Sequence, residues 1–126
     1  MQTVAMRVTE GNAVSTQLFD RESALARVGD DPELLAELAK LFLADYPNNI
    51  QAMKEALAGG DPMLLERAAH SLKGAVANFG AMEVVQEAYA LERMGRQGDL
   101  SHANDSLQKL CEAMEQLDHE LRPFAY

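Results

Sequence analysis

Residues 100–121 read LSHANDSLQKLCEAMEQLDHEL, and this stretch decides the fold. Its apolar side chains recur at alternating intervals of three and four residues. That spacing is the a/d pattern of a helix that packs in a bundle. The stretch therefore predicts an amphipathic helix whose buried side consists of Leu100, Ala103, Leu107, Leu110, Met114, Leu117 and Leu121.

Glycine and acidic residues divide the rest of the chain into further helices. A glycine that ends one helix is followed by an acidic N-cap for the next at residues 29–32, 59–62 and 98–99, and proline takes the first helical position in the first two. Another glycine, Gly80, ends the predicted helix over 62–79. These signals predict helices over 20–28, 32–58, 62–79 and 81–96, besides the one over 100–121. Pro47 falls inside the second, where we expect a kink and no hydrogen bond to the carbonyl of Leu43.

Each of these helices has one apolar side, and no run of alternating β-branched residues indicates a strand. The connections are short, so successive helices are expected to be antiparallel neighbours. The predicted fold is therefore all-α, an antiparallel up-and-down four-helix bundle with a short additional N-terminal helix. The inward-facing residues outside the last helix are predicted to be Leu25, Val28, Leu34, Leu35, Leu38, Leu41, Phe42, Ile50, Met53, Leu57, Leu65, Ala68, Ala69, Leu72, Val76, Phe79, Val84, Ala88 and Leu91.

The amino-acid composition limits the classes of partner that the protein can bind. The 126 residues include 20 acidic and 11 basic ones, for a net charge of −9, and they suffice for one domain. We expect a flexible N-terminal tail over 1–15 and the bundle domain over 16–126. Such acidity argues against nucleic acid and membrane surfaces and favours protein partners. The single cysteine excludes an intrachain disulfide and fits a cytoplasmic protein, which we expect to be a monomer.

The helix over 62–79 contains the residues that indicate chemistry. His70 lies on its polar side, Lys73 follows about one turn later, and Gly74 stands near mid-helix, where glycine costs about 1 kcal/mol relative to alanine. An exposed imidazole at pH 7 is largely neutral and keeps a nucleophilic lone pair, and an ammonium group can hold an anion attached to it. The pattern favours phosphoryl transfer, in which positioning and charge stabilisation supply most of the catalysis. It does not favour general acid-base hydrolysis, because no second carboxylate or nucleophile is paired with the histidine by spacing.

The motif Ala69-His70-x-Leu72-Lys73-Gly74, followed by Gly80, resembles the signature of histidine-containing phosphotransfer (HPt) domains of two-component phosphorelays. The similarity extends over about 19–121 and includes residues 42–47 and 88–92. It implies that His70 accepts a phosphoryl group from an aspartate of one receiver domain and passes it to another receiver. It also implies that Lys73 steadies the phosphoryl oxygens and that Gly74 lets the receiver come close.

One position departs from a frequent form of the family pattern. Some members carry a glutamine, hydrogen-bonded to the imidazole, where this chain has Glu92. A carboxylate can also accept the Nδ1 proton and leave Nε2 free, so Glu92 is either a support for His70 or a solvated helix residue. Five residues around the same face are candidates for partner docking or ordinary surface positions: Met63, Glu66, Arg67, Ala77 and Ala81.

Other functions remain as alternatives. The bundle could be the His-bearing domain of a chemotaxis-type kinase, or an adaptor that binds a receiver or kinase without carrying phosphate. A metal-binding bundle has less support, because His102, His119 and Cys111 match no ligand spacing and are expected to be solvated or packed. We expect no metal, no cofactor and no ATP-dependent kinase activity, since the chain has no Gly-rich phosphate loop.

Overall fold

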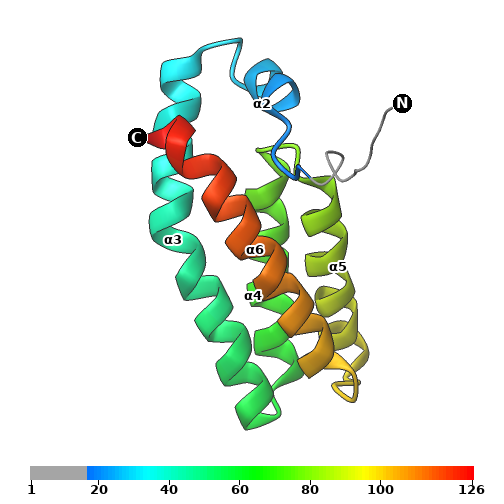
Figure 1. The fold of residues 1–126 in the computed structure, drawn as a ribbon. Coiled ribbons are helices and arrows are strands. Elements are labelled where there is room, and N and C mark those ends of the chain that lie inside the picture. The colour runs from blue at the N-terminus through cyan, green and yellow to red at the C-terminus, as the bar shows by residue number, and fades with distance from the viewer. Residues whose placement is uncertain (1–16) are drawn as a thin grey trace, which may run out of the picture.

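The computed structural model describes residues 17–126, and in this range it contains five helices and no strand. The predicted tail over 1–15 lies outside the described residues. Four long helices run side by side, and the short α2 lies at one end of them (Figure 1). None of the helices in the described range is both long and apolar enough to cross a bilayer. The helices are α2 (Arg21–Arg27), α3 (Pro32–Gly59), α4 (Pro62–Ala77), α5 (Met82–Gln97) and α6 (Ala103–Ala125).

The four long helices close into a ring. α3 packs against α4 and α6, and α5 packs against the same two helices. Short connections join consecutive helices, so each runs antiparallel to the next, as Figure 1 shows. The predicted up-and-down four-helix bundle with a short N-terminal helix is confirmed.

Aspartate side chains begin the first three helices as the sequence predicts. The carboxylates of Asp20, Asp31 and Asp61 accept hydrogen bonds from backbone N–H groups in the first turns of α2, α3 and α4. The third predicted glycine–aspartate pair, at residues 98–99, is different. The Asp99 carboxylate instead accepts hydrogen bonds from the backbone amide and the hydroxyl of Ser101. Asp99 therefore closes a turn, and α6 begins only at Ala103. The prediction that Asp99 caps this helix was wrong.

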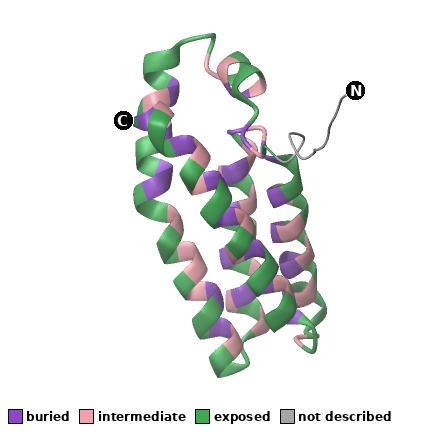
Figure 2. Ribbon diagram, viewed as in Figure 1, coloured by how far each residue is buried: buried purple, intermediate pink, exposed green. Residues whose placement is uncertain are grey.

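The apolar sides predicted for α4, α5 and α6 form the core, which Figure 2 shows as purple segments facing the inside of the bundle. In α3 two predictions were wrong: Leu34 is 45% exposed and Leu41 is 67% exposed. Each lies one residue before a core residue, about 100° around the helix from Leu35 or Phe42. α3 instead buries Leu35, Ala39, Phe42, Leu43, Met53 and Ala56.

Aromatic packing and one carboxylate fix α2 to the bundle. The ring centroid of Phe19 lies 6.3 Å from that of Phe79 and 5.7 Å from that of Phe124. Glu120 on α6 accepts the backbone N–H groups of Leu18 and Phe19, at 2.9 and 2.7 Å. The segment before α2 is thereby held against the ends of α4 and α6.

A polar contact also joins α3 to α6. α3 runs through Pro47 without ending, and the kink expected there stays a prediction. The hydroxyl of the neighbouring Tyr46 donates to Asp118 on α6 at 2.6 Å. Burial would raise the pKa of Asp118, but hydrogen bonds from Arg122 and Tyr46 outweigh it and lower that pKa. The carboxylate therefore stays ionised between its two donors.

Candidate functional site

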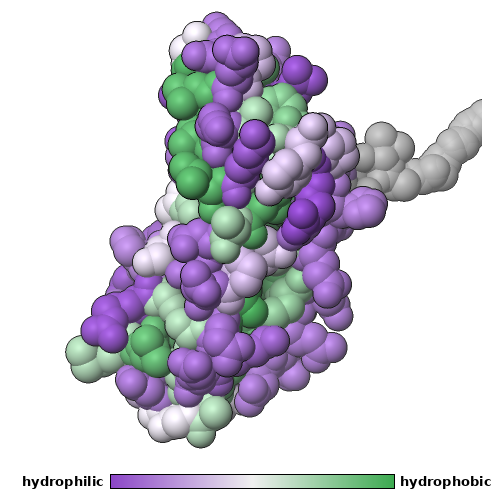
Figure 3. Space-filling view, turned by 90° about the vertical axis from the view of Figure 1, so that its left-hand side faces the viewer, coloured by the Kyte–Doolittle hydropathy of each residue, from purple (hydrophilic) through white to green (hydrophobic). Residues whose placement is uncertain are grey.

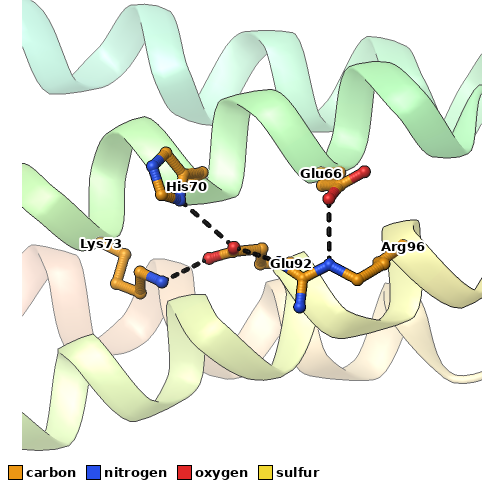
Figure 4. Close-up of polar contacts among 5 residues, drawn as sticks. All are labelled: Glu66, His70, Lys73, Glu92 and Arg96. Atoms are coloured by element: carbon orange, nitrogen blue, oxygen red, sulfur yellow. Dashed lines mark hydrogen bonds and ion pairs between the residues drawn. The ribbon is translucent and has the colours of Figure 1, made fainter.

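His70 lies on the outer side of α4, where its side chain is 68% exposed. The opposite side of the same helix is fully occupied by the core, with Leu65, Ala69, Leu72 and Val76 all buried. Figure 4 shows the ring leaning toward α5, and its Nδ1 atom lies 3.2 Å from Oε2 of Glu92. One ring nitrogen thus contacts a buried carboxylate, while the ring as a whole faces solvent.

Glu92 on α5 is the centre of the site. Its side chain is 3% exposed, yet it contacts three polar side chains. Lys73 Nζ lies 2.8 Å from Oε1, and Arg96 Nη2 lies 2.6 Å from Oε2, the oxygen that also faces His70. Of the two alternatives for Glu92, the solvated helix carboxylate is therefore wrong.

The ionised state of Glu92 determines the state of the histidine ring. Burial alone would raise the pKa of this carboxyl, but its polar contacts with Lys73 and His70 outweigh burial and lower it. An ionised carboxylate has no proton to donate, so the hydrogen between the two groups is carried by Nδ1 of His70. In the neutral ring, Nε2 is then the nitrogen with the free lone pair.

A glycine missed by the sequence analysis brings α5 close enough for this contact. A Cβ atom at Gly95 would lie 2.6 Å from the carbonyl oxygen of Pro62 and 2.7 Å from the backbone nitrogen of Glu66. Only glycine fits between α4 and α5 at this distance. Its sequence signal was a second glycine inside a predicted helix, comparable to Gly74.

Lys73 is held between a carboxylate and an aromatic ring. Its ammonium lies 4.9 Å from the ring centroid of Tyr89, besides its ion pair with Glu92. These two partners keep the charge on the side of α4 that faces α5. Tyr89, which is 37% exposed, lies in the 88–92 stretch that resembles the family but was not predicted as a site residue.

Gly74 differs from Gly95 in having nothing beside it. A Cβ atom built there would meet no atom within 4 Å. The fold does not require glycine at this position, which lies on the exposed side of α4 one turn after His70. The absence of a side chain leaves open space next to the histidine.

The predicted docking residues divide into three groups. Met63 is 69% exposed and Arg67 is also exposed, so both are available to a partner. Glu66 and Ala77 are half-buried, and Glu66 accepts a bond from Arg96 Nε at 3.1 Å. Ala81 is fully buried, so its prediction as a docking residue was wrong. The left-handed turn at Gly80, with φ of 65°, directs the chain inward before α5 begins.

An apolar groove lies beside the histidine face. It has a volume of about 450 Å³ between α3 and α4 and includes Leu41, Phe42, Ala75 and Asn78 in its lining. Ala75 and Asn78 come within four residues of Gly74, so the groove lies along the C-terminal part of α4, where that glycine also stands. On the face of the molecule drawn in Figure 3, hydrophilic residues dominate and hydrophobic residues form separate patches.

The other histidines and the cysteine lie apart from this site. His102 and His119 are exposed, and Cys111 is half-buried with a free thiol, as predicted. Across residues 17–126, no three histidine, cysteine or acidic side chains gather in a way that could hold a metal ion.

Comparisons with known proteins agree with this geometry. The family described as Hpt domain matches residues 37–120 of the chain. The fold is similar to the crystal structure of histidine-containing phosphotransfer protein B (HptB) from Pseudomonas aeruginosa PAO1, with a TM-score of 0.79 and 21% sequence identity. That similarity covers 86% of this chain and 94% of that chain. No curated protein matches in a sequence search.

Proposed function

Because this chain belongs to the family of Hpt domains, which serve phosphotransfer in two-component signalling, we propose that His70 is its phosphoryl carrier. In this proposal His70 receives the group from an aspartate of one receiver domain and passes it to an aspartate of another. The observation that supports it is the state of the ring, with Nδ1 bound to Glu92 and the other nitrogen free on an exposed face. The carrier domain would span residues 16–126, act as a monomer and work in the cytoplasm.

The chemistry follows from that ring state. The lone pair of Nε2 attacks the phosphorus of an aspartyl phosphate, an N–P bond forms, and the P–O bond breaks to release the aspartate carboxylate. The Nδ1 proton stays in place, so the ring gains positive charge. The Glu92 carboxylate accepts that proton's hydrogen bond and stabilises the charge, as a buried carboxylate does for an imidazolium. The reverse reaction passes the group to the next receiver.

Lys73 and Gly74 serve the transferred group in different ways. The Lys73 ammonium lies one turn from His70 and can move from Glu92 to the phosphoryl oxygens, where it offsets their charge. The open space at Gly74 admits the edge of the receiver that carries the reactive aspartate. Positioning and charge stabilisation of this kind provide most of the catalysis in phosphoryl transfer.

The receiver would dock over the exposed side of α4. Met63 and Arg67 lie on this side, and the small side chain of Ala77 adds little bulk to it. The groove between α3 and α4 offers an apolar surface beside it. Small and apolar residues then surround the histidine, with charged residues at the rim. That composition is typical of a protein interface with a polar rim.

The test is transfer of label from a phosphorylated receiver domain. Wild-type protein should gain acid-labile, alkali-stable label, as a phosphohistidine does, and His70→Gln should gain none. His102→Gln is the matched control and should be labelled like wild type, because His102 directly precedes α6 and does not lie on α4. Label that persists in His70→Gln would refute the proposal. Label that comes only from a kinase domain with ATP would instead support the chemotaxis-type role, and binding without label would support the adaptor.

A further inference from the structure

Arg96 contacts the same carboxylate oxygen that holds the histidine. Its Nη2 atom donates to Glu92 Oε2 at 2.6 Å, while His70 Nδ1 lies 3.2 Å from that oxygen. Arg96 is one turn after Glu92 on α5, and its Nε atom donates to Glu66 on α4. The guanidinium thus bridges the two helices beside the reactive side chain.

Two cations neutralise Glu92, and they approach it from opposite ends, as Figure 4 shows. Lys73 lies after His70 on α4, within reach of a group attached to the ring. Arg96 is fixed on the other side by its second bond, to Glu66, which lies one turn before His70. The two cations are therefore suited to different tasks.

We propose that Arg96 is a positioning residue that stays on Glu92 when Lys73 turns to the phosphoryl group, and so keeps the carboxylate ionised and directed at His70 Nδ1. This inference rests on the proposed function of His70. The physical reason is the burial of Glu92, whose side chain is 3% exposed. A buried carboxylate that loses its partner is strongly destabilising, because its charge is no longer compensated. With Arg96 in place, Lys73 can leave without exposing Glu92 to that penalty.

The role of Arg96 extends to the reaction itself. Once a phosphoryl group is attached to Nε2, negative charge lies near the Glu92 carboxylate. Arg96 offsets part of the repulsion between these two anions and leaves the Nδ1 hydrogen bond intact. Without Arg96, Lys73 is the remaining cation on Glu92, and it cannot serve the carboxylate and the phosphoryl oxygens equally well.

The first measurement uses the unphosphorylated protein. The side-chain carboxyl of Glu92, followed by ¹³C NMR, should titrate at higher pH in Arg96→Gln than in wild type, because one cationic partner is lost. Glu66→Gln is the matched control: it removes the charge of the other partner of Arg96, while the amide oxygen can still accept the Arg96 Nε hydrogen bond. The contact with Glu92 is kept, and the titration should stay close to that of wild type. An unmoved titration in Arg96→Gln would overturn the assignment of Arg96 on its own.

The second measurement uses protein phosphorylated by potassium phosphoramidate, in which the donor P–N bond breaks and ammonia leaves as the ring nitrogen bonds to phosphorus. Transfer from this protein to a receiver domain should be about tenfold slower in Arg96→Gln, the factor expected for a lost charged hydrogen bond. In a Glu92→Gln background the same substitution should change the rate less than about twofold, since no buried charge is left to compensate.

The outcomes separate the two proposals. An equal effect of Arg96→Gln in both backgrounds would overturn the positioning role. If wild-type protein takes no phosphoryl group on His70 from phosphoramidate or from any receiver, the proposed function fails. The proposed movement of Lys73 from Glu92 to the phosphoryl group then fails with it. The NMR titration still decides whether Arg96 controls the charge of Glu92.

Discussion

Two glycines inside helices should respond to the same substitution in opposite ways. Gly74→Ala adds a Cβ atom that meets nothing within 4 Å. Alanine favours the interior of a helix by about 1 kcal/mol over glycine, so the free energy of unfolding should rise by about that amount. Urea unfolding at 25 °C, followed by circular dichroism, measures the difference.

Gly95→Ala places its Cβ atom 2.6 Å from the carbonyl oxygen of Pro62, whereas ordinary contact begins at 3.4 Å. The obstacle is backbone, so α4 and α5 must separate to admit the methyl group. Overpacking of this kind costs about 1–3 kcal/mol and offsets the gain in helix propensity. We expect a lower free energy of unfolding than in wild type and a weaker contact between His70 and Glu92.

At position 74, phosphotransfer should respond to a larger side chain in the opposite way from stability. A larger side chain at position 74, as in Gly74→Leu, should leave the fold stable but slow phosphotransfer sharply, because it fills the space beside His70. The reasoning would be refuted if Gly74→Ala were less stable than wild type, or if Gly95→Ala were as stable. Unchanged transfer in Gly74→Leu would show that the gap does not serve access.

Two further predictions concern stability. Burial raises the pKa of Glu87, whose Oε1 is buried without a hydrogen-bond partner, so the folded protein holds this proton more tightly than the unfolded chain does. The stability that this group contributes is then lost as pH rises above the ordinary pKa value of 4.5. In urea unfolding, Glu87→Gln should be more stable than wild type at pH 7 and no more stable below about pH 4. Equal unfolding curves for the two proteins at both pH values would contradict this. Tyr46→Phe removes the 2.6 Å bond to Asp118 and should lower the free energy of unfolding by about 1–2 kcal/mol. Its thermal midpoint checks this, and Tyr126→Phe, at an exposed residue, should not change it.

The sequence predicted the bundle because its signals are local. The a/d spacing of α6 and the aspartate caps of the first three helices depend on neighbours within a few residues. Leu34 and Leu41 could not be placed in this way, because α3 is leucine-rich around much of its circumference and only packing against α4 and α6 selects its buried side. Asp99 likewise looked like a cap until the backbone showed a turn at Ser101.

The same limit applies to the site. His70, Lys73 and Gly74 were found because they lie within five residues of one helix. Arg96, Tyr89 and Gly95 were missed, since their importance depends on how closely α5 approaches α4. Ala81 was misplaced because a helical wheel does not describe the left-handed turn at Gly80.

His70 and the four polar side chains drawn around it in Figure 4 all project from regular turns of α4 and α5, and no loop contributes to them. A surface of this kind has little conformational entropy to lose when another protein docks on it. We therefore expect the domain to meet the receivers proposed above as a rigid body. Discrimination among receivers would then depend on how well each one's own surface fits this fixed shape.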